Sequence, residues 1–436
     1  MLDTRYVVRY TLEIQSTGLL QIGDGEQDIL LDAYSGKPQL PATGIAGALR
    51  NYLTVNACDK KVLKRLFGNV EGEKSRLFPE DGEYLGGELH IEHRERVRID
   101  GRTGTAMDGG KFHVNALPAG QKFRIAFHLE AADETEKEEF CRRLEEAFRG
   151  LNSGVIRFGA QKTNGAGSFT IQKAERMEYD LYDSNELEKY LLKKENQKEN
   201  VLTAVQCNSA GENTAQFEID AKTVTPLLIA GVSANRKDQA DKVPVKRADG
   251  AYIVPGSSFK GVLRMQCERI ADYLNIPMGM VEEIFGSDAS RDINHEDRSA
   301  GKLFAEDAVI RNGKAKTVYN RIAVDKFTGG VRNGAKFDAM PVEGNVRIKV
   351  FLVDSDRNRK AHIGLTLLAL RDIFSERVAI GGVNNVGYGR IRGKEIRVQD
   401  GERNCIISME DWNRSDAAEY VKILLAERTD ITGEME

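Results

Sequence analysis

Residues 255–264 read Pro-Gly-Ser-Ser-Phe-Lys-Gly-Val-Leu-Arg, and residues 41–50 read Pro-Ala-Thr-Gly-Ile-Ala-Gly-Ala-Leu-Arg. In both stretches a proline and a hydroxyl residue precede apolar residues at helical spacing, so each predicts the start of an amphipathic helix. Thr43 and either Ser257 or Ser258 are the expected N-caps. Because the two stretches resemble each other, they also predict an internal repeat.

Four further blocks recur in the same order around these helices. They pair residues 18–23 with 226–231, 66–69 with 284–287, 96–104 with 321–329, and 159–167 with 381–389. Chance similarity would not reproduce this order, and each unit is long enough to hold its own core. We therefore predict four segments, namely a first module (1–178), a linker with a charged helix (179–214), a second module (215–398) and a helical tail (399–436).

The pattern inside each module indicates an α+β fold. Apolar residues occupy every second position from Tyr6 to Ile14, which is typical of a strand with one buried face. Strand-like runs and second helices follow, at 123–129 and 134–149 in the first module and at 346–352 and 362–374 in the second. The order strand, helix, insertion, strand, helix, strand predicts a ferredoxin-like, or RRM-like, sheet with an elaborated middle. A last helix is expected over residues 409–426.

The composition indicates which cellular compartment and which kinds of partner we expect. The five cysteines are far apart and suggest no disulfide framework, so we expect a cytoplasmic protein. No apolar run approaches the ~18 residues of a membrane helix, and Met1 to Arg5 does not read as a signal peptide, so no membrane partner is expected. The net charge of −4 argues against binding nucleic acid by overall charge, and any basic groove must be local.

The segment from Lys314 to Phe337 is the strongest local signal for nucleic acid. It carries six basic side chains and one acidic one, Asp325, with interleaved aromatic residues and glycines. Such a hairpin can neutralise phosphates and stack on bases, although a solvated loop is the alternative interpretation. The RNA-binding candidates in this segment and in its first-module counterpart are Arg321, Lys326, Arg332, Lys336, Arg96, Arg98 and Arg102.

The repeated helix start and the glycine loops are further candidate contacts. A helix N-terminus carries partial positive charge, and Lys260 and Arg264 lie one turn apart there, whereas the first module keeps Arg50 but has Ala46 in place of the lysine. The glycine loops precede strands and lack the order of a dinucleotide or P-loop motif, so they favour close approach by a ribose-phosphate backbone. Their polar candidates are Lys162, Asn164, Asn384 and Asn385.

Taken in order, these blocks resemble the RAMP backbone subunits of type III CRISPR effector complexes. The helix start at 255–264, Phe-Gly-Ser at 285–287, Arg-x-x-x-Asp-x-x-Thr-Gly at 321–329 and the closing glycine loop carry the resemblance. It implies two tandem ferredoxin-like RAMP modules, each with an inserted thumb hairpin, near 92–116 and 314–340. The implied partners are guide RNA, complementary target RNA, other RAMP backbone subunits, a large polymerase/cyclase-like subunit and a small helical subunit.

The resemblance also implies a cleavage site, because some of these subunits cut target RNA with an aspartate in the loop before the first helix. Asp241 fits best in the second module, in a context one residue longer than the family's Asp-x-Pro-Val, and Asp28 and Asp24 are the first-module candidates. Asp241 and Asp28 would hold Mg²⁺ or Mn²⁺. A loop carboxylate can bind a divalent ion or orient a 2′-hydroxyl for in-line attack.

Three alternatives stay open. The first is an RNA-binding scaffold without catalysis. The second is a guide-processing endoribonuclease, which usually needs a histidine near the first helix, and residues 1–60 and 215–290 contain none. The third is a small-molecule enzyme, for which the sequence shows no converging polar constellation.

Overall fold

The computed structural model describes residues 4–23, 29–100, 105–206, 211–231, 240–287, 299–315 and 318–428. The alternating segment forms β1 (Tyr6–Ser16), which pairs antiparallel with β6 (Lys122–Ala131) and β7 (Phe169–Asp180). Shorter strands complete the order β2-β6-β1-β7-β8, with β3 beside β6, and these are β2 (Leu77–Pro79), β3 (Glu83–Tyr84) and β8 (Lys198–Asn200). The order of β2, β6, β1 and β7 is that of a ferredoxin-like sheet.

Helices α1 (Ala42–Val55) and α3 (Glu134–Asn152) pack in the core of the first module. α1 buries Ile45, Leu49 and Leu53, as the helical spacing predicts. The short helix α2 (Lys60–Phe67) follows α1 and adds two buried leucines to the same core. The hydrophobic side chains of the helices and of the strands therefore form one core between the helices and the sheet. The alternate positions of β1, such as Arg9, Thr11 and Glu13, are polar and lie on the other face of the sheet.

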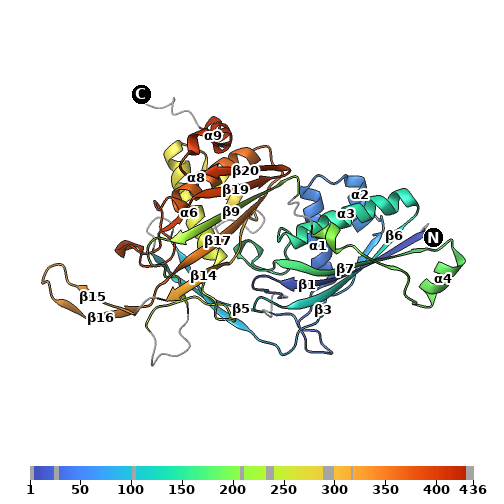
Figure 1. Ribbon diagram of the computed structural model, residues 1–436, viewed down its shortest axis with the longest axis horizontal. Helices are drawn as coiled ribbons and strands as arrows, with labels where there is room; N and C mark the ends of the chain where they lie inside the picture. The colour runs from blue at the N-terminus through green and yellow to red at the C-terminus, as the bar shows by residue number, and fades with distance from the viewer. Residues whose placement is uncertain are drawn as a thin grey trace.

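The second module repeats this plan around β9 (Thr214–Thr223), which pairs antiparallel with β17 (Val342–Val353) and β19 (Glu395–Asp400). The sheet order is β12-β14-β17-β9-β19-β20, with β13 beside β17 and β18 beside β9. The remaining strands of this sheet are β12 (Ile253–Val254), β13 (Leu303–Ala305), β14 (Ala308–Ala315), β18 (Ile391–Gly393) and β20 (Arg403–Ser408). The two modules lie side by side (Figure 1).

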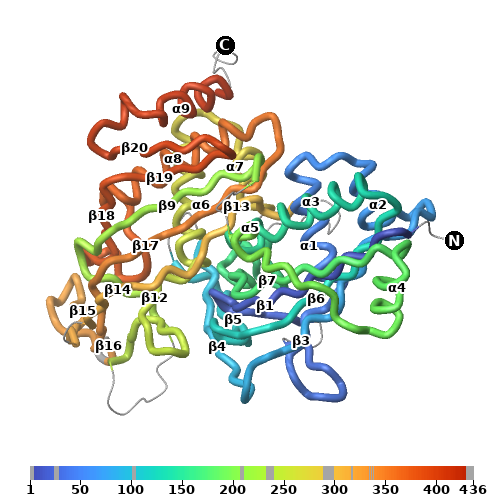
Figure 2. The backbone as a smooth tube through the Cα atoms, turned by 45° about the vertical axis from the view of Figure 1, so that its right-hand side comes forward, coloured from blue at the N-terminus to red at the C-terminus, as the bar shows by residue number. Residues whose placement is uncertain are grey.

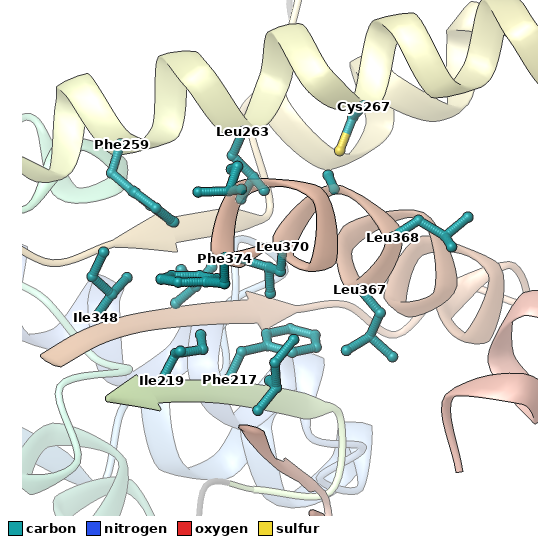
Figure 3. Close-up of a cluster of buried hydrophobic side chains, with 14 of the residues drawn as sticks. Phe217, Ile219, Phe259, Leu263, Cys267, Ile348, Leu367, Leu368, Leu370 and Phe374 are labelled. Carbon is teal, nitrogen blue, oxygen red and sulfur yellow. The ribbon is translucent and has the colours of Figure 1, made fainter. Parts of the chain in front are cut away.

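Helices α6 (Gly256–Leu274) and α8 (Arg359–Phe374) form the core of the second module. Figure 3 shows Phe259 and Leu263 of α6 above Phe374 of α8, with Phe217 of β9 beneath. Phe259, Leu263 and Cys267 are all buried, as predicted for this helix. Helices α7 (Met278–Phe285) and α9 (Ala417–Ala426) add to the same core.

Each module carries an inserted hairpin between its second and third strand positions, as predicted. The first is β4 (Glu92–Ile99) with β5 (Ala106–Ala116), and the second is β15 (Tyr319–Val324) with β16 (Val331–Ala339). Figures 1 and 2 show β15–β16 projecting from the outer end of the second module, whereas β4–β5 lies between the modules. The α+β fold of two ferredoxin-like modules with inserted hairpins is therefore confirmed.

The predicted N-caps are wrong. Pro41 and Pro255 occupy the cap positions without a side-chain cap, and Thr43, Ser257 and Ser258 lie inside the helices. Aspartates from distant loops take over this role. Asp81 Oδ1 accepts a hydrogen bond from Ala42 N at 2.7 Å, and Asp307 Oδ1 accepts one from Gly256 N at 2.8 Å. A carboxylate near a helix N-terminus satisfies an exposed N–H and interacts favourably with the helix dipole.

The linker and the tail also differ in detail from the sequence pattern. The charged helix is α4 (Ser184–Leu191), and the chain then forms β8 and α5 (Leu202–Val205). The last helix begins at Ala417, eight residues later than expected, after the short 3-10 turn Trp412–Arg414. Small strands β10 (Ala230–Gly231) and β11 (Val243–Pro244) pair beside the β15–β16 hairpin. Across the described segments, no helix is long and apolar enough to cross a membrane.

Candidate nucleic-acid interface

The glycine loop of the first module docks on the helix start of the second. A Cβ on Gly165 would lie 2.8 Å from Asp307 Oδ1, and one on Gly154 would lie 2.9 Å from Glu306 Oε1. Arg157 Nη2 lies 3.4 Å from Glu306 Oε1, and its guanidinium also covers the Phe304 ring. This part of the predicted RNA site is therefore the joint between the modules.

Two polar residues of that loop, Asn164 and Lys162, are accordingly less accessible to RNA than the sequence suggests. Asn164 Nδ2 donates to Gln161 Oε1 at 2.8 Å, and Arg96 Nη1 donates to the same oxygen at 3.0 Å. Lys162 is half-buried, and burial lowers the pKa of its ammonium group. Arg96 is also half-buried, with a pKa lowered mainly by burial. These side chains are held within the first module and leave only part of their surface for RNA.

The matching loop of the second module is open. Gly165 and Gly387 have nearly the same positive φ, 93° and 92°, but a Cβ on Gly387 would meet nothing within 4 Å. Asn384 and Asn385 are exposed, and the only hydrogen bond found for either residue within the described segments is the one that the backbone oxygen of Asn384 accepts from Gly387 N. The second loop therefore keeps the surface that the first loop uses for packing.

Lys260 lies where the two modules meet, on the first turns of α6. Burial first, and then the nearby guanidinium groups of Arg264 and Arg157, lower the pKa of Lys260 to about 8. No carboxylate within the described residues pairs with its ammonium group. An uncompensated cation at a helix N-terminus favours an anion such as phosphate.

Arg264 of α6 and Arg50 of α1 occupy equivalent positions but differ in their contacts. Arg264 Nε donates to Glu268 Oε1 at 2.9 Å and Nη1 donates to Gly286 O at 3.1 Å, so two of its five N–H donors are occupied. Its first-module counterpart, Arg50, is exposed. Arg264 therefore holds α6 against the end of α7, and Lys260 is the better candidate for a direct phosphate contact.

The base of the β15–β16 hairpin joins the open glycine loop through stacked side chains. Arg321 lies 4.8 Å from the centre of the Tyr388 ring, and the Tyr319 ring lies 6.3 Å from it. Arg321 Nε and Tyr388 Oη are both shielded from solvent, and neither has a hydrogen-bond partner in the part of the chain that the structure describes. Buried polar atoms normally have partners, so this pair is suited to a bound ligand.

The outer part of the hairpin is exposed. Lys326 lies over the Phe327 ring, 4.9 Å from its centre, and that ring is 85% exposed. Arg332 and Lys336 are exposed on the return strand. Asp325 builds the turn, because its carboxylate accepts hydrogen bonds from Thr328 N and Phe327 N, which lower its pKa. The hairpin thus presents cations and the Phe327 ring to solvent. In the first hairpin Arg98 is exposed, and Arg102 lies outside the described residues.

Asp241 lies at the base of this hairpin. It is exposed, and its Oδ2 accepts a hydrogen bond from Asp338 N of β16 at 3.0 Å. The described segments contain no group of three or more side chains that could hold a metal ion. Asp24 and Asp28, the first-module candidates, lie outside the described residues.

Several residues that define the site were not among the sequence candidates. Arg94, Arg157, Glu306 and Asp307 form the joint, and Tyr388 anchors the hairpin. One signal was present, since residues 77–81 read Leu-Phe-Pro-Glu-Asp and residues 303–307 read Leu-Phe-Ala-Glu-Asp. This is a sixth repeated block, and its aspartates cap the two helix starts.

Comparison with known families agrees with this geometry. The family model of the RAMP superfamily matches residues 15–170 and 220–392, one region in each module. The chain therefore belongs to the RAMP superfamily. No curated protein matches it. Membership indicates a CRISPR-associated role in RNA binding.

Proposed function

We propose that this chain is a guide-RNA-binding backbone subunit of a type III CRISPR effector complex in antiviral defence. The observation that carries the proposal is the open surface of the second module. There, the Arg321–Tyr388 contact links the exposed Asn384-Asn385 loop to the base of a basic hairpin. Lys260 offers a further cation at the joint between the modules. Phosphate contacts position an RNA strand without reading its sequence, as a guide-binding subunit requires.

The joint between the modules suggests a path for the RNA strand. Lys260 of the second module lies close to Arg157 of the first. A phosphate at Lys260 would thus lie beside both modules, and the strand would continue toward the open glycine loop. Glycines there let the ribose-phosphate backbone approach exposed N–H groups. The exposed Phe327 and the cations of the hairpin would then meet or displace a base at regular intervals.

RNA binding is tested with the intact chain. We expect the chain from its native host to copurify with RNA of defined length, and recovery free of RNA would overturn the proposal. Lys260→Gln should weaken binding of unrelated RNA sequences to a similar degree and reduce the slope of affinity against salt. Lys360→Gln, which removes an exposed lysine on α8, is the matched control and should leave both quantities unchanged.

The second part of the proposal is cleavage of bound target RNA at Asp241, with Asp28 or Asp24 as the counterpart in the first module. Asp241 would hold Mg²⁺ or Mn²⁺ or orient the attacking 2′-hydroxyl. Its support is its position, because it contacts the strand β16 at the base of the hairpin where a displaced nucleotide would lie.

Cleavage is tested on the assembled complex with labelled complementary RNA, with and without magnesium. Asp241→Asn should abolish one metal-dependent cut while guide binding persists, and Asp249→Asn, in the next loop, should cut normally. Unchanged cutting in Asp241→Asn, Asp28→Asn and the double variant would leave the non-catalytic scaffold. That scaffold is the second candidate function, favoured by the hydrogen bond that already engages Asp241 Oδ2. A guide-processing endoribonuclease is the least supported candidate.

The proposed protein partners follow from the same assignment. They are other RAMP backbone subunits, a large polymerase/cyclase-like subunit and a small helical subunit. Isolation of the complex under native conditions and identification of its chains tests this set.

A further inference from the structure

The joint shows how one module of this fold docks on another. We call the residues Phe304, Glu306 and Asp307, with the N-terminus of α6, the acceptor face of the second module. The donor face of the first module consists of its glycine loop, Arg94 and Arg157. Arg94 Nη1 binds Asp307 Oδ2 at 2.6 Å, and Arg157 binds Glu306 while its guanidinium lies 5.5 Å from the centre of the Phe304 ring.

The first module has an equivalent acceptor face that is open. Phe78, Glu80 and Asp81 occupy the repeated positions, and Asp81 Oδ1 caps α1 as Asp307 Oδ1 caps α6. Asp81 Oδ2 accepts a hydrogen bond from the amide of Gln39 at 2.8 Å, where Asp307 binds an arginine. Phe78 is 42% exposed, and Glu80 is exposed without an ion pair in the described parts of the chain.

The second module has a donor face in the same place but lacks both arginines. Arg96 and Arg321 lie opposite equivalent phenylalanines in the two hairpins, so Tyr319 takes the place of Arg94. The loops match through positive φ at Gly159 and Gly381, 84° and 89°, so Ala379 takes the place of Arg157. The second module therefore cannot form either ion pair of the joint.

We propose that the open acceptor face of the first module binds a RAMP-type module of a different chain, one that carries arginines at the positions of Arg94 and Arg157. The second module of this same chain does not fill the site. Docking it there would desolvate Glu80 and Asp81 without a cation, and unpaired buried carboxylates oppose association. This inference rests on the proposed assembly with other RAMP subunits, and the first experiment, on the isolated chain without RNA, tests the docking face separately from that assembly.

The first experiment restores the missing arginines in the full chain. By sedimentation velocity without RNA, the wild type should stay monomeric over a concentration series, while Tyr319→Arg combined with Ala379→Arg should form head-to-tail oligomers. Adding Glu80→Arg should weaken that association by about tenfold or more, because it places like charges together. Glu71→Arg, on an exposed turn of the same module, should have no effect.

Two results of this experiment would overturn the proposal. One is a double variant that stays monomeric while its circular dichroism and melting temperature match those of the wild type. The other is a wild-type chain that already self-associates and loses this property with Glu80→Arg.

The second experiment needs no folded double variant. A photo-reactive residue replaces Phe78 in the native host, and the crosslinked peptide is identified by mass spectrometry. We expect a peptide from the glycine loop or hairpin of another RAMP-type chain. The same residue at Phe304 is the control and should crosslink to residues 153–167 of its own chain. A crosslink from position 78 to the 381–389 loop of this chain, to an unrelated protein, or to nothing while the control reacts, would overturn the proposal.

Discussion

Arg94 of the first module and Asp307 of the second form a buried ion pair across the joint, with side chains only 9% and 8% exposed. Burial alone would lower the pKa of Arg94, but Asp307 and Glu92 outweigh this effect and leave the pKa raised. The other oxygen of Asp307 caps α6 through Gly256 N. One carboxylate therefore both joins the modules and holds the helix start on which Lys260 lies.

Replacing Arg94 should destabilise the chain. Arg94→Met leaves Asp307 buried without its cation, which costs about 3 kcal/mol in comparable cases. We expect the midpoint of urea unfolding to fall clearly, together with faster proteolysis between the modules. Arg98→Met, an exposed neighbour on the same strand, should shift the midpoint little, and equal effects of the two changes would contradict a structural role for the ion pair.

The two glycine loops provide a matched pair of variants. Gly165→Ala and Gly387→Ala introduce the same strain, because both residues have φ near 92°, and such strain costs about 1–2 kcal/mol. Only Gly165→Ala also forces a Cβ to 2.8 Å from Asp307 Oδ1. We expect it to lower the free energy of unfolding by more than Gly387→Ala does. Equal losses would mean that the loop does not pack in the joint.

RNA affinity should depend on pH through Lys260. Its pKa of about 8 in the free protein means that the ammonium form dominates below pH 8 and is lost above it. A bound phosphate favours that form, so affinity should fall by about threefold to tenfold between pH 7 and pH 9. Lys260→Arg should stay protonated and bind equally at both values, whereas Lys260→Gln should bind weakly at both. Binding titrations across this range at constant salt provide the measurement.

The variant Tyr388→Phe should show whether the Tyr388 hydroxyl serves RNA binding or folding. The Tyr388 hydroxyl is buried without a partner in the described segments, so its removal should leave the melting temperature unchanged or slightly raise it. The ring still supports Arg321. If the hydroxyl binds RNA, the dissociation constant should rise by about fivefold, close to the typical 1 kcal/mol of a hydrogen bond. A stability loss with unchanged affinity would assign the hydroxyl to folding.

The sequence by itself was sufficient for the architecture. The ordered repeat predicted two modules, period-two alternation predicted β1, and helical spacing placed Ile45, Leu49 and Leu53 in the core. The resemblance to RAMP subunits predicted a hairpin near 314–340, where β15 and β16 pair. The helix and the strand were predictable because their hydrophobic periodicity depends only on residues that are close together in the sequence.

Only the tertiary structure decided how equivalent motifs differ in use. The sequence predicts Thr43 and Ser257 as helix caps. In the structure, Asp81 and Asp307, about 40 to 50 residues away, accept the hydrogen bonds from the helix N-termini. The two glycine loops share a conformation, but one is packed against Asp307 and the other is open. The reason is that burial depends on which surface docks on a motif, and the decisive contact, Arg94 with Asp307, joins residues 213 positions apart. A local pattern carries no information about such a partner.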